Sequence, residues 1–211
     1  MNSLKDIRNI IFDLGGVILN IDYQRTEDAF KELGMTHFGQ EYSQKQQSNF
    51  FDQFETGQMD IPTFLETLRK QCPMAQSDYD VIAAWNAMLL DLPLRRLQLL
   101  QQLQIHFNTF LLSNTNELHE QAFNKTLQAQ CGHTHFGFFF DRVYYSHRVG
   151  LRKPNKEVFE LILEQNNLKP EQTLFLDDSL QHVDSARSLG LQVIHLHAGM
   201  SMEKDIFKAK Q

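Results

Sequence analysis

The sequence predicts an α/β protein with a three-layer core, a parallel sheet and one inserted helical domain. After residue 91, short apolar runs of the kind found in buried strands alternate with helical segments of about 10–15 residues, which is typical of parallel βαβ units. Residues 22–91, by contrast, have helical periodicity and almost no strand signal. We therefore expect residues 1–21 and 92–211 to form the core and residues 22–91 to form a four-helix cap domain.

The first predicted strand ends in a carboxylate. Ile10-Ile11-Phe12 is an apolar run short enough for a buried strand, and Asp13 follows it directly, with Gly15 and Gly16 close behind. In open parallel sheets the ligand crevice lies outside the carboxyl ends of the strands. Asp13 is therefore a candidate nucleophile.

Helix-end signals divide the inserted segment into four helices, expected over 23–33 and 40–54 and then from residues 60 and 77 onward. Gly34 is a typical C-cap, and Asp60 is a typical N-cap with Pro62 in the first turn. The aromatic side chains of this segment are expected in its core rather than against a substrate: Phe50, Phe51, Phe54 and Trp85. Tyr23 is expected at an exposed helix start.

The remainder of the chain alternates between the two kinds of element. Helices are expected over 91–104, 117–130, 155–166 and 180–189, and strands over 107–112, 138–145, 173–176 and 192–197. These strands continue the sheet that the first strand begins.

The composition predicts a globular protein that acts on small molecules. Among 211 residues, 42% are hydrophobic and 22% are charged, which permits a sizeable core and gives no sign of disorder. The net charge of −6 argues against nucleic-acid binding. The sequence contains no apolar run of about 18 residues and no secretory signal at the N-terminus, and the two cysteines lack metal-ligand spacing. We expect a cytoplasmic protein without a membrane partner, either a monomer or a homodimer.

Polar groups follow four of the predicted strands. Besides Asp13, these are Ser113 and Asn114, Lys153, and Asp177 with Asp178. The carboxyl ends of parallel strands meet at one edge of the sheet, so we expect these groups to converge. Their chemistry fits phosphoryl transfer: a carboxylate can attack phosphorus, a hydroxyl and backbone N–H groups can hold phosphoryl oxygens, and an acidic pair supplies the oxygen ligands that Mg²⁺ prefers.

The same segments carry a family resemblance. Asp13-Leu14-Gly15-Gly16-Val17, Ser113-Asn114, Lys153-Pro154 and Asp177-Asp178-Ser179 resemble, in order, the four motifs of the haloacid dehalogenase (HAD) superfamily. The finer pattern is most similar to the bacterial α-D-glucose-1-phosphatase-like branch. The N-terminal phosphatase domain of soluble epoxide hydrolases is a more distant relative. The resemblance implies a Rossmann-like core with a helical cap.

The resemblance also implies residue roles. Asp13 matches the nucleophile, and Ser113 and Lys153 match the other catalytic residues. The phosphate-binding positions it implies are Ser113, Asn114, Lys153 and Gly16. The Mg²⁺ ligands it implies are Asp13, the Gly15 carbonyl, Asp178 and Asp177.

The chain departs from this pattern at two positions. Gly15 stands where the family has the aspartate that protonates the leaving group and later activates water. General acid–base catalysis contributes roughly 10²–10⁴-fold, so its loss should slow turnover without abolishing attack. His182 stands four residues after Asp178, where Asp or Asn is usual, and is a candidate replacement. Asp22 is another.

These observations predict a Mg²⁺-dependent phosphomonoesterase that acts on a small phosphorylated metabolite, with a sugar phosphate favoured by the resemblance alone. A 2-haloacid dehalogenase is an alternative, but it needs no metal and leaves Asp177 and Asp178 unexplained. A phosphomutase would also want the acid that Gly15 lacks. A non-catalytic module that binds a phosphorylated ligand or a protein is the alternative from another class.

Overall fold

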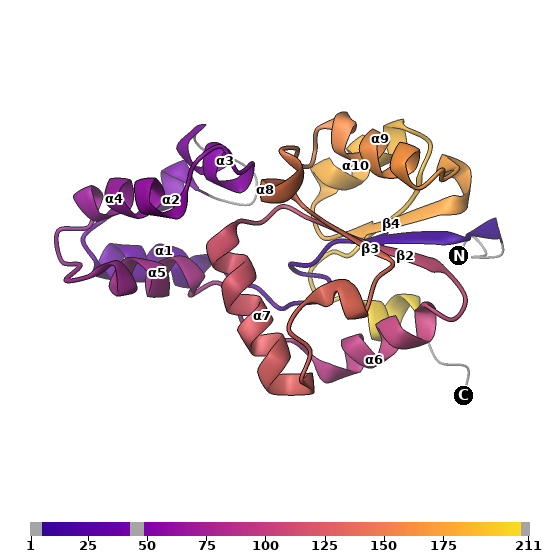
Figure 1. The fold of residues 1–211 in the computed structure, drawn as a ribbon, viewed down its shortest axis with the longest axis horizontal. Coiled ribbons are helices and arrows are strands. Elements are labelled where there is room, and N and C mark those ends of the chain that lie inside the picture. The colour runs from indigo at the N-terminus through magenta and orange to yellow at the C-terminus, as the bar shows by residue number, and fades with distance from the viewer. Residues whose placement is uncertain (1–5, 43–48, 208–211) are drawn as a thin grey trace.

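A five-stranded parallel sheet forms the centre of the molecule in the computed structural model, which describes residues 6–42 and 49–207. The strands are β1 (Asn9–Phe12), β2 (Asn108–Ser113), β3 (Arg142–Tyr145), β4 (Thr173–Asp177) and β5 (Gln192–His195). Their order is β3-β2-β1-β4-β5, with every neighbouring pair parallel. Because β1 lies between β2 and β4, the carboxyl ends of these three strands are adjacent (Figure 1).

Helices cover both faces of the sheet, so the predicted three layers are confirmed. Ile10 and Phe12 pack in one apolar cluster with α6 (Leu94–Leu103) and α7 (Glu117–Cys131). Ile11 points the other way and packs with α9 (Lys156–Gln165) and α10 (Leu180–Ser188). The alternation follows from the two-residue period of a strand. Burial on both faces explains why β1 is a continuous apolar run.

The inserted segment forms a helical group to one side of the sheet, on the left in Figure 1. It comprises α1 (Tyr23–Glu32), α2 (Phe38–Glu41), α3 (Asn49–Glu55), α4 (Ile61–Gln71) and α5 (Asp78–Asn86). It has an aromatic core of its own, built on Phe30, Phe38, Phe51, Phe54, Phe64 and Trp85. The expected core positions of Phe51, Phe54 and Trp85 are confirmed, and Phe50 packs against them partly buried.

Capping residues set the helix ends as the sequence indicates. The Asp60 side chain accepts a hydrogen bond from the Thr63 backbone N–H at 3.0 Å, and Pro62 lies in the first turn of α4. At the start of α5, Ser77 and Asp80 form a capping box. The chain leaves α1 through Gly34, whose φ of +94° a residue with a Cβ adopts only at a cost.

The two chain crossings between the helical group and the sheet lie side by side. Ile21 and Leu89 form an antiparallel bridge, and the Asn20 N–H donates to the Asp91 carbonyl at 3.0 Å while the Leu90 N–H donates to the Asn20 carbonyl at 2.9 Å. The helical group is therefore joined to the rest of the molecule by a short paired connection.

Two predicted elements differ from the structure. The helix expected over 40–54 is divided: α2 ends at Glu41, α3 begins at Asn49, and residues 43–48 lie outside the described part of the chain. The strand expected over 138–145 begins only at Arg142, because Phe136, Phe139 and Phe140 all pack in one apolar cluster instead of alternating between faces. A 3₁₀ turn, η2 (Phe136–Phe138), occupies part of that segment.

Shorter elements complete the chain: α8 (Ser146–Val149) directly after β3, η3 (Pro170–Gln172) before β4, and a π-helical turn η4 (Met202–Ile206) near the end. In residues 6–42 and 49–207, none of the helices has the length and apolar character needed to span a membrane.

Candidate active site

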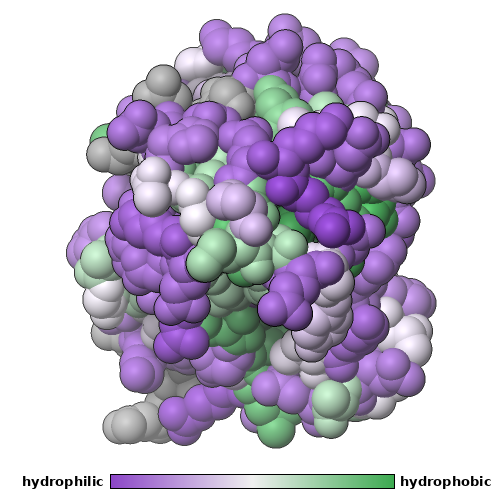
Figure 2. All heavy atoms as spheres, turned by 90° about the vertical axis from the view of Figure 1, so that its left-hand side faces the viewer, coloured by the Kyte–Doolittle hydropathy of each residue, from purple (hydrophilic) through white to green (hydrophobic). Residues whose placement is uncertain are grey.

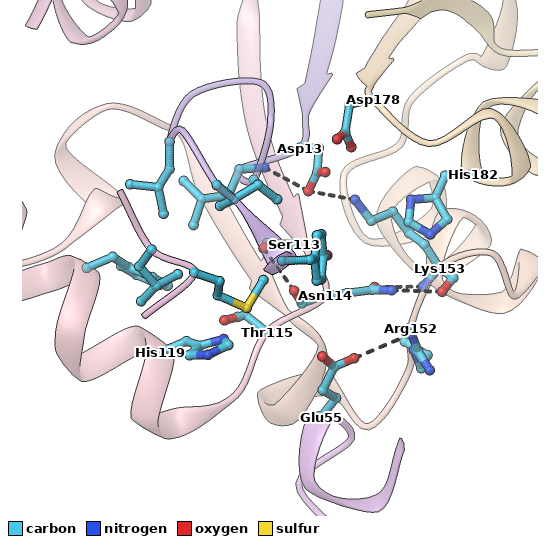
Figure 3. Close-up of a pocket in the computed structure, with 18 of the residues that line it drawn as sticks. Asp13, Glu55, Ser113, Asn114, Thr115, His119, Arg152, Lys153, Asp178 and His182 are labelled. Carbon is cyan, nitrogen blue, oxygen red and sulfur yellow. Dashed lines mark hydrogen bonds and ion pairs between the residues drawn. The ribbon is translucent and has the colours of Figure 1, made fainter. Parts of the chain in front are cut away.

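A pocket lies at the carboxyl edge of the sheet, under the helical group. The sheet domain contributes residues that the sequence predicts, namely Asp13, Gly15, Ser113, Asn114, Lys153, Asp178 and His182. The helical group contributes Tyr23, Tyr42 and Glu55, and the connection contributes Met88 and Leu89. Figure 3 shows the labelled side chains from both parts pointing toward one space. The expected convergence of polar groups at this edge is therefore seen.

Asp13 is held where β1 ends. Its Oδ1 atom accepts a hydrogen bond from the Leu14 backbone N–H at 2.7 Å and lies 2.7 Å from Lys153 Nζ. Its own N–H donates to the Leu176 carbonyl at 2.9 Å, so β4 fixes its backbone. The residue is 7% exposed. The carboxylate is thus fixed in direction while it faces the pocket.

Lys153 bridges two carboxylates. Its Nζ atom lies 2.7 Å from Asp13 Oδ1 and 2.7 Å from Asp177 Oδ2, and the residue is fully buried. Burial favours the neutral amine, but the two carboxylates outweigh it and raise the pKa of Lys153. The ammonium is therefore charged at neutral pH and can balance negative charge that develops beside Asp13.

Ser113 and Asn114 close the end of β2. Ser113 is buried and its hydroxyl makes only a long bond, 3.4 Å, to the Asn114 carbonyl. The Asn114 side chain donates to the Lys153 carbonyl at 2.8 Å and accepts from the Lys153 N–H at 2.9 Å. The Asn114 side-chain amide is therefore committed to the Lys153 backbone, and the phosphate contact of Asn114 stays a prediction.

Three carboxylates lie together in the part of the chain that the structure describes. Asp13, Asp177 and Asp178 each place an oxygen within 4.8 Å of the others. A Cβ on Gly16, whose φ is +72°, would lie 2.3 Å from Asp178 Oδ2, so only glycine lets Asp178 approach. The Gly16 N–H donates to the Leu19 carbonyl at 2.9 Å, and the phosphate contact of Gly16 stays a prediction.

The electrostatics of this cluster favour a divalent cation. Burial raises the pKa of Asp13 well above its usual value, and Asp177 and Asp178 raise it further, against the lowering effect of Lys153. At Asp177 the balance is reversed, because Lys153 and His182 outweigh burial and lower the pKa of its carboxyl. The Lys153 ammonium thus pairs with two of the three carboxylates. The donors are all hard oxygens, so the residues present fit Mg²⁺.

His182 lines the pocket and contacts Asp177. Its Nδ1 atom lies 3.0 Å from Asp177 Oδ1, and burial lowers the pKa of the imidazole. A neutral ring whose Nδ1–H donates to the carboxylate keeps a basic Nε2 atom. Asp22, the other candidate proton carrier, caps α1 by accepting from the Gln24 N–H at 3.0 Å and does not line the pocket. Of the two, only His182 lines the pocket.

Sequence reasoning missed several pocket residues, namely Tyr23, Tyr42, Glu55, His119 and Arg152. The expected exposure of Tyr23 is wrong: it is half-buried against the pocket, because α1 starts directly at the connection to the sheet. The position of Arg152 beside Lys153 was a signal that could have been used. The others depend on how the helical group sits over the sheet, which local pattern does not encode.

His119 joins the helical group to the sheet domain. Its ring stacks on Trp85, its Nε2 atom lies 3.1 Å from the Trp85 carbonyl, and its Nδ1 atom lies 3.1 Å from the Asn116 side-chain amide. Burial lowers the pKa of His119 to about 4. Both ring nitrogens have partners, so this histidine serves packing and is not placed to carry protons.

Comparison with known proteins identifies the class. Residues 7–190 match the family model described as haloacid dehalogenase-like hydrolase. The match covers most of the chain and includes every motif discussed above. The chain therefore belongs to the haloacid dehalogenase-like hydrolase family.

Particular relatives match along nearly the whole chain. The chain is 26% identical to a D-ribitol-5-phosphate phosphatase from Bacteroides thetaiotaomicron, over 95% of this chain and 97% of the relative. It is 25% identical to a sesquiterpene phosphatase from Aspergillus oryzae, over 88% of each chain. Both relatives bear phosphatase names.

Solved structures show the same fold. One is a HAD family enzyme from Bacteroides thetaiotaomicron, an aspartate-to-alanine variant in complex with magnesium and inorganic phosphate, with a TM-score of 0.86, 30% identity, and coverage of 92% of this chain and 96% of that one. A predicted HAD-like hydrolase from Porphyromonas gingivalis gives 0.81 at 28% identity, with coverage of 92% and 93%. L-2-haloacid dehalogenase from Xanthobacter autotrophicus, at 19% identity and 0.57 over 90% of this chain and 77% of that one, shares the fold alone.

Proposed function

We propose that the protein is a Mg²⁺-dependent phosphomonoesterase that hydrolyses a small phosphorylated metabolite, a sugar or polyol phosphate, through an aspartyl-phosphate intermediate. One observation carries the proposal: the Lys153 ammonium lies 2.7 Å from both Asp13 and Asp177, in a pocket that Ser113 and Asp178 also reach. The hydrolase family, and phosphatase relatives that match the chain almost end to end, support it.

The helical group serves as a cap in this proposal. Residues 22–91 form the cap, and residues 1–21 and 92–211 form the core. The separate aromatic core of the helices and the paired crossing at Ile21 and Leu89 support this division. The cap excludes bulk water from the pocket during the reaction.

In the first step, an Asp13 oxygen attacks phosphorus in line, the bond from phosphorus to the leaving oxygen breaks, and the departing alkoxide takes a proton from water. The fixed carboxylate meets the phosphoryl group without having to reorient, since the Leu14 N–H and Lys153 already hold Oδ1. The Ser113 hydroxyl and the backbone N–H of Asn114 hold phosphoryl oxygens. Lys153 balances the charge that builds between the nucleophile and the phosphoryl group.

Asp13, Asp178, the Gly15 carbonyl and Asp177 would hold the Mg²⁺ ion. A bound ion would offset the repulsion between the Asp13 carboxylate and the phosphate, and it would stabilise charge on the phosphoryl oxygens. Within the set, Asp177 has a second role, because its two oxygens already meet Lys153, the Ser179 N–H and His182. It orients these groups beside Asp13.

In the second step, water hydrolyses the aspartyl-phosphate. Gly15 supplies no acid or base, and His182 takes over proton transfer with Asp177 fixing its ring. A sugar 1-phosphate or another good leaving group would need less help in the first step. Turnover is therefore slower than with an aspartate at position 15.

A panel of phosphorylated metabolites tests the proposal. Phosphate release is measured with Mg²⁺, with EDTA, and with the Asp13→Asn variant. The proposal expects release that both EDTA and the substitution abolish. Absence of release from every monoester by a folded protein would indicate a binding module, and chloride release insensitive to EDTA would indicate a dehalogenase.

A further inference from the structure

A second polar cluster lies on the cap side of the same pocket. Tyr42 directly follows α2, Glu55 ends α3, and Arg152 precedes Lys153 in the core. The Tyr42 hydroxyl donates to Glu55 Oε1 at 3.1 Å, and Arg152 Nη2 lies 3.4 Å from Glu55 Oε2. Figure 3 shows Glu55 and Arg152 across the pocket from Asp13 and Asp178. The space between is where the leaving group of an Asp13-bound phosphate would lie.

Glu55 is an unusual residue for its surroundings. It is 2% exposed and lies at the edge of the aromatic cluster that contains Phe51, Phe54 and Trp85. A carboxylate is expensive to bury, and an apolar side chain of similar size often stabilises such a site better. Packing alone therefore does not explain a glutamate here.

Among the described residues, the carboxylates at this wall outnumber the guanidinium they contact. Arg152 also pairs with Asp52, so two carboxylates share its one guanidinium. Tyr23 also lines the pocket: burial raises the pKa of its phenol well above the usual value, and the charges of Glu55, Asp178 and Asp13 raise it further. The field of Glu55 thus reaches into the space that the leaving group would occupy.

Another part of the pocket lining is apolar and consists of Leu19, Ile21, Met88 and Leu89. A pocket with one apolar wall and one wall ending in a carboxylate suits a carbon chain whose hydroxyl groups face Glu55, because hydroxyls donate to carboxylates. A leaving group with its own carboxylate would meet Glu55 with like charge.

We propose that Glu55, held by Arg152 and Tyr42, is a specificity-determining residue that binds a hydroxyl of an uncharged, hydroxylated leaving group and repels leaving groups that carry an anionic group. The inference rests on the phosphatase activity proposed above. It assigns Glu55 a contact with substrate, and it assigns Arg152 and Tyr42 the positioning of Glu55.

A matched pair of substrates provides the test. Glycerol 3-phosphate and 3-phosphoglycerate differ only in a terminal CH₂OH group or a carboxylate, so the ratio of their kcat/KM values reports the effect of that charge. A hydrogen bond to a charged group changes binding by about ten- to a hundredfold, and we expect the wild type to favour the alcohol by at least that lower factor. Glu55→Gln, which keeps the shape, should reduce the ratio about tenfold. Tyr42→Phe should also reduce the ratio of the two kcat/KM values.

Asp52→Asn is the matched control. Asp52 pairs with the same guanidinium, but its side chain is 41% exposed and it does not line the pocket. The ratio should stay within about twofold in this variant, since exposed ion pairs contribute little. If Glu55 only held the cap against Arg152, Glu55→Gln and Asp52→Asn would each change kcat/KM by the same factor for both substrates.

The outcomes are distinct. An unchanged ratio in folded Glu55→Gln and Tyr42→Phe, with hydrolysis retained, overturns the assignment of Glu55 and leaves the phosphatase proposal standing. An equal change in Asp52→Asn also overturns it. Failure of the wild type to hydrolyse either substrate or p-nitrophenyl phosphate refutes the phosphatase proposal and the inference together. Unfolding temperatures show whether each variant is folded.

Discussion

Asn114 and Lys153 exchange two hydrogen bonds across the carboxyl edge of the sheet. The Asn114 amide donates to the Lys153 carbonyl at 2.8 Å, and the Lys153 N–H donates to the Asn114 side-chain oxygen at 2.9 Å. The residue that follows β2 therefore fixes the loop that carries the buried lysine. Lys153 is held by its backbone as well as by the two carboxylates at its ammonium.

Removing this pair should affect catalysis more than stability. In Asn114→Ala the loop can shift, and a misplacement of about 1 Å at a reacting group lowers kcat/KM by up to about a hundredfold. Stability should fall by about 1–3 kcal/mol, because backbone groups lose their partners. Steady-state kinetics and urea unfolding measure both effects.

Asn166→Ala is the control for this prediction. The Asn166 amide donates to the Tyr144 hydroxyl and to the Ile162 carbonyl, both at 2.7 Å and away from the pocket. It should lose stability with kcat/KM retained. Equal kinetic losses in the two variants would show that Asn114 has no special role in placing Lys153.

Mg²⁺ binding should depend on the absence of a side chain at Gly16. Gly16→Ala places a methyl group against the Asp178 carboxylate, 2.3 Å from Oδ2, and should weaken Mg²⁺ binding by roughly ten- to a hundredfold, as displacement of groups around a metal does. Gly132→Ala has nearly the same backbone strain, with φ of +79°, but nothing within 4 Å of the new Cβ. It should lose about 1–2 kcal/mol of stability with Mg²⁺ affinity retained. Calorimetric titration distinguishes displacement of Asp178 from general strain.

Lys153 should stabilise the metal-free protein strongly. Lys153→Met removes the cation from two carboxylates, and breaking a buried ion pair costs about 3–5 kcal/mol. Mg²⁺ should recover part of this loss, since the ion supplies positive charge at the same place. Urea unfolding in EDTA and in Mg²⁺ checks both statements. A loss below about 1 kcal/mol in EDTA, the level of an exposed pair, would contradict the burial of this charge.

The core and its rim were predictable because their signals are local. A strand buried on both faces is an apolar run, and Asp13 and Asp177 stand at the point where such a run ends. Because the five strands are parallel, the sheet places those strand ends at one edge. The positions of Asp13, Ser113 and Asp178 in one pocket follow from that geometry, whereas Lys153 reaches the pocket from a loop that the Asn114 side chain holds.

The cap side of the pocket was not predictable in the same way. Glu55 and Tyr42 become pocket residues only because α3 and α2 sit over the sheet, and helical periodicity marks a buried face without saying what it faces. The prediction that the strand starts in the phenylalanine run before β3 is wrong for another reason. A run of four phenylalanines interrupted by Gly137 suits a strand or a turn equally well, and tertiary packing favours the turn.

Stability should fall as the pH drops below neutrality because of His119. Its folded-state pKa of about 4 lies below the unfolded value of 6.5, so between these values the unfolded chain binds more protons and is favoured by acid. The contribution of His119 to the free energy of unfolding is complete above the unfolded-state pKa. It should decrease by about 2 kcal/mol between pH 7 and pH 5. Urea unfolding at the two pH values measures it.

His119→Gln should remove this part of the pH dependence. His106→Gln, which replaces an exposed histidine, should leave it intact. An identical pH dependence in the His119 variant and the wild type would mean that His119 is not buried in neutral form against Trp85.

The aspartyl-phosphate that we propose at Asp13 can be observed directly. Acid quenching during turnover in Mg²⁺, followed by proteolysis and mass spectrometry, locates any covalent phosphoryl group. The structure and the proposed mechanism predict one on the peptide that contains Asp13, absent in EDTA and in Asp13→Asn. Phosphate release from a monoester with no phosphoryl group on that peptide, or with one on another residue, would contradict the assignment of Asp13 as the nucleophile.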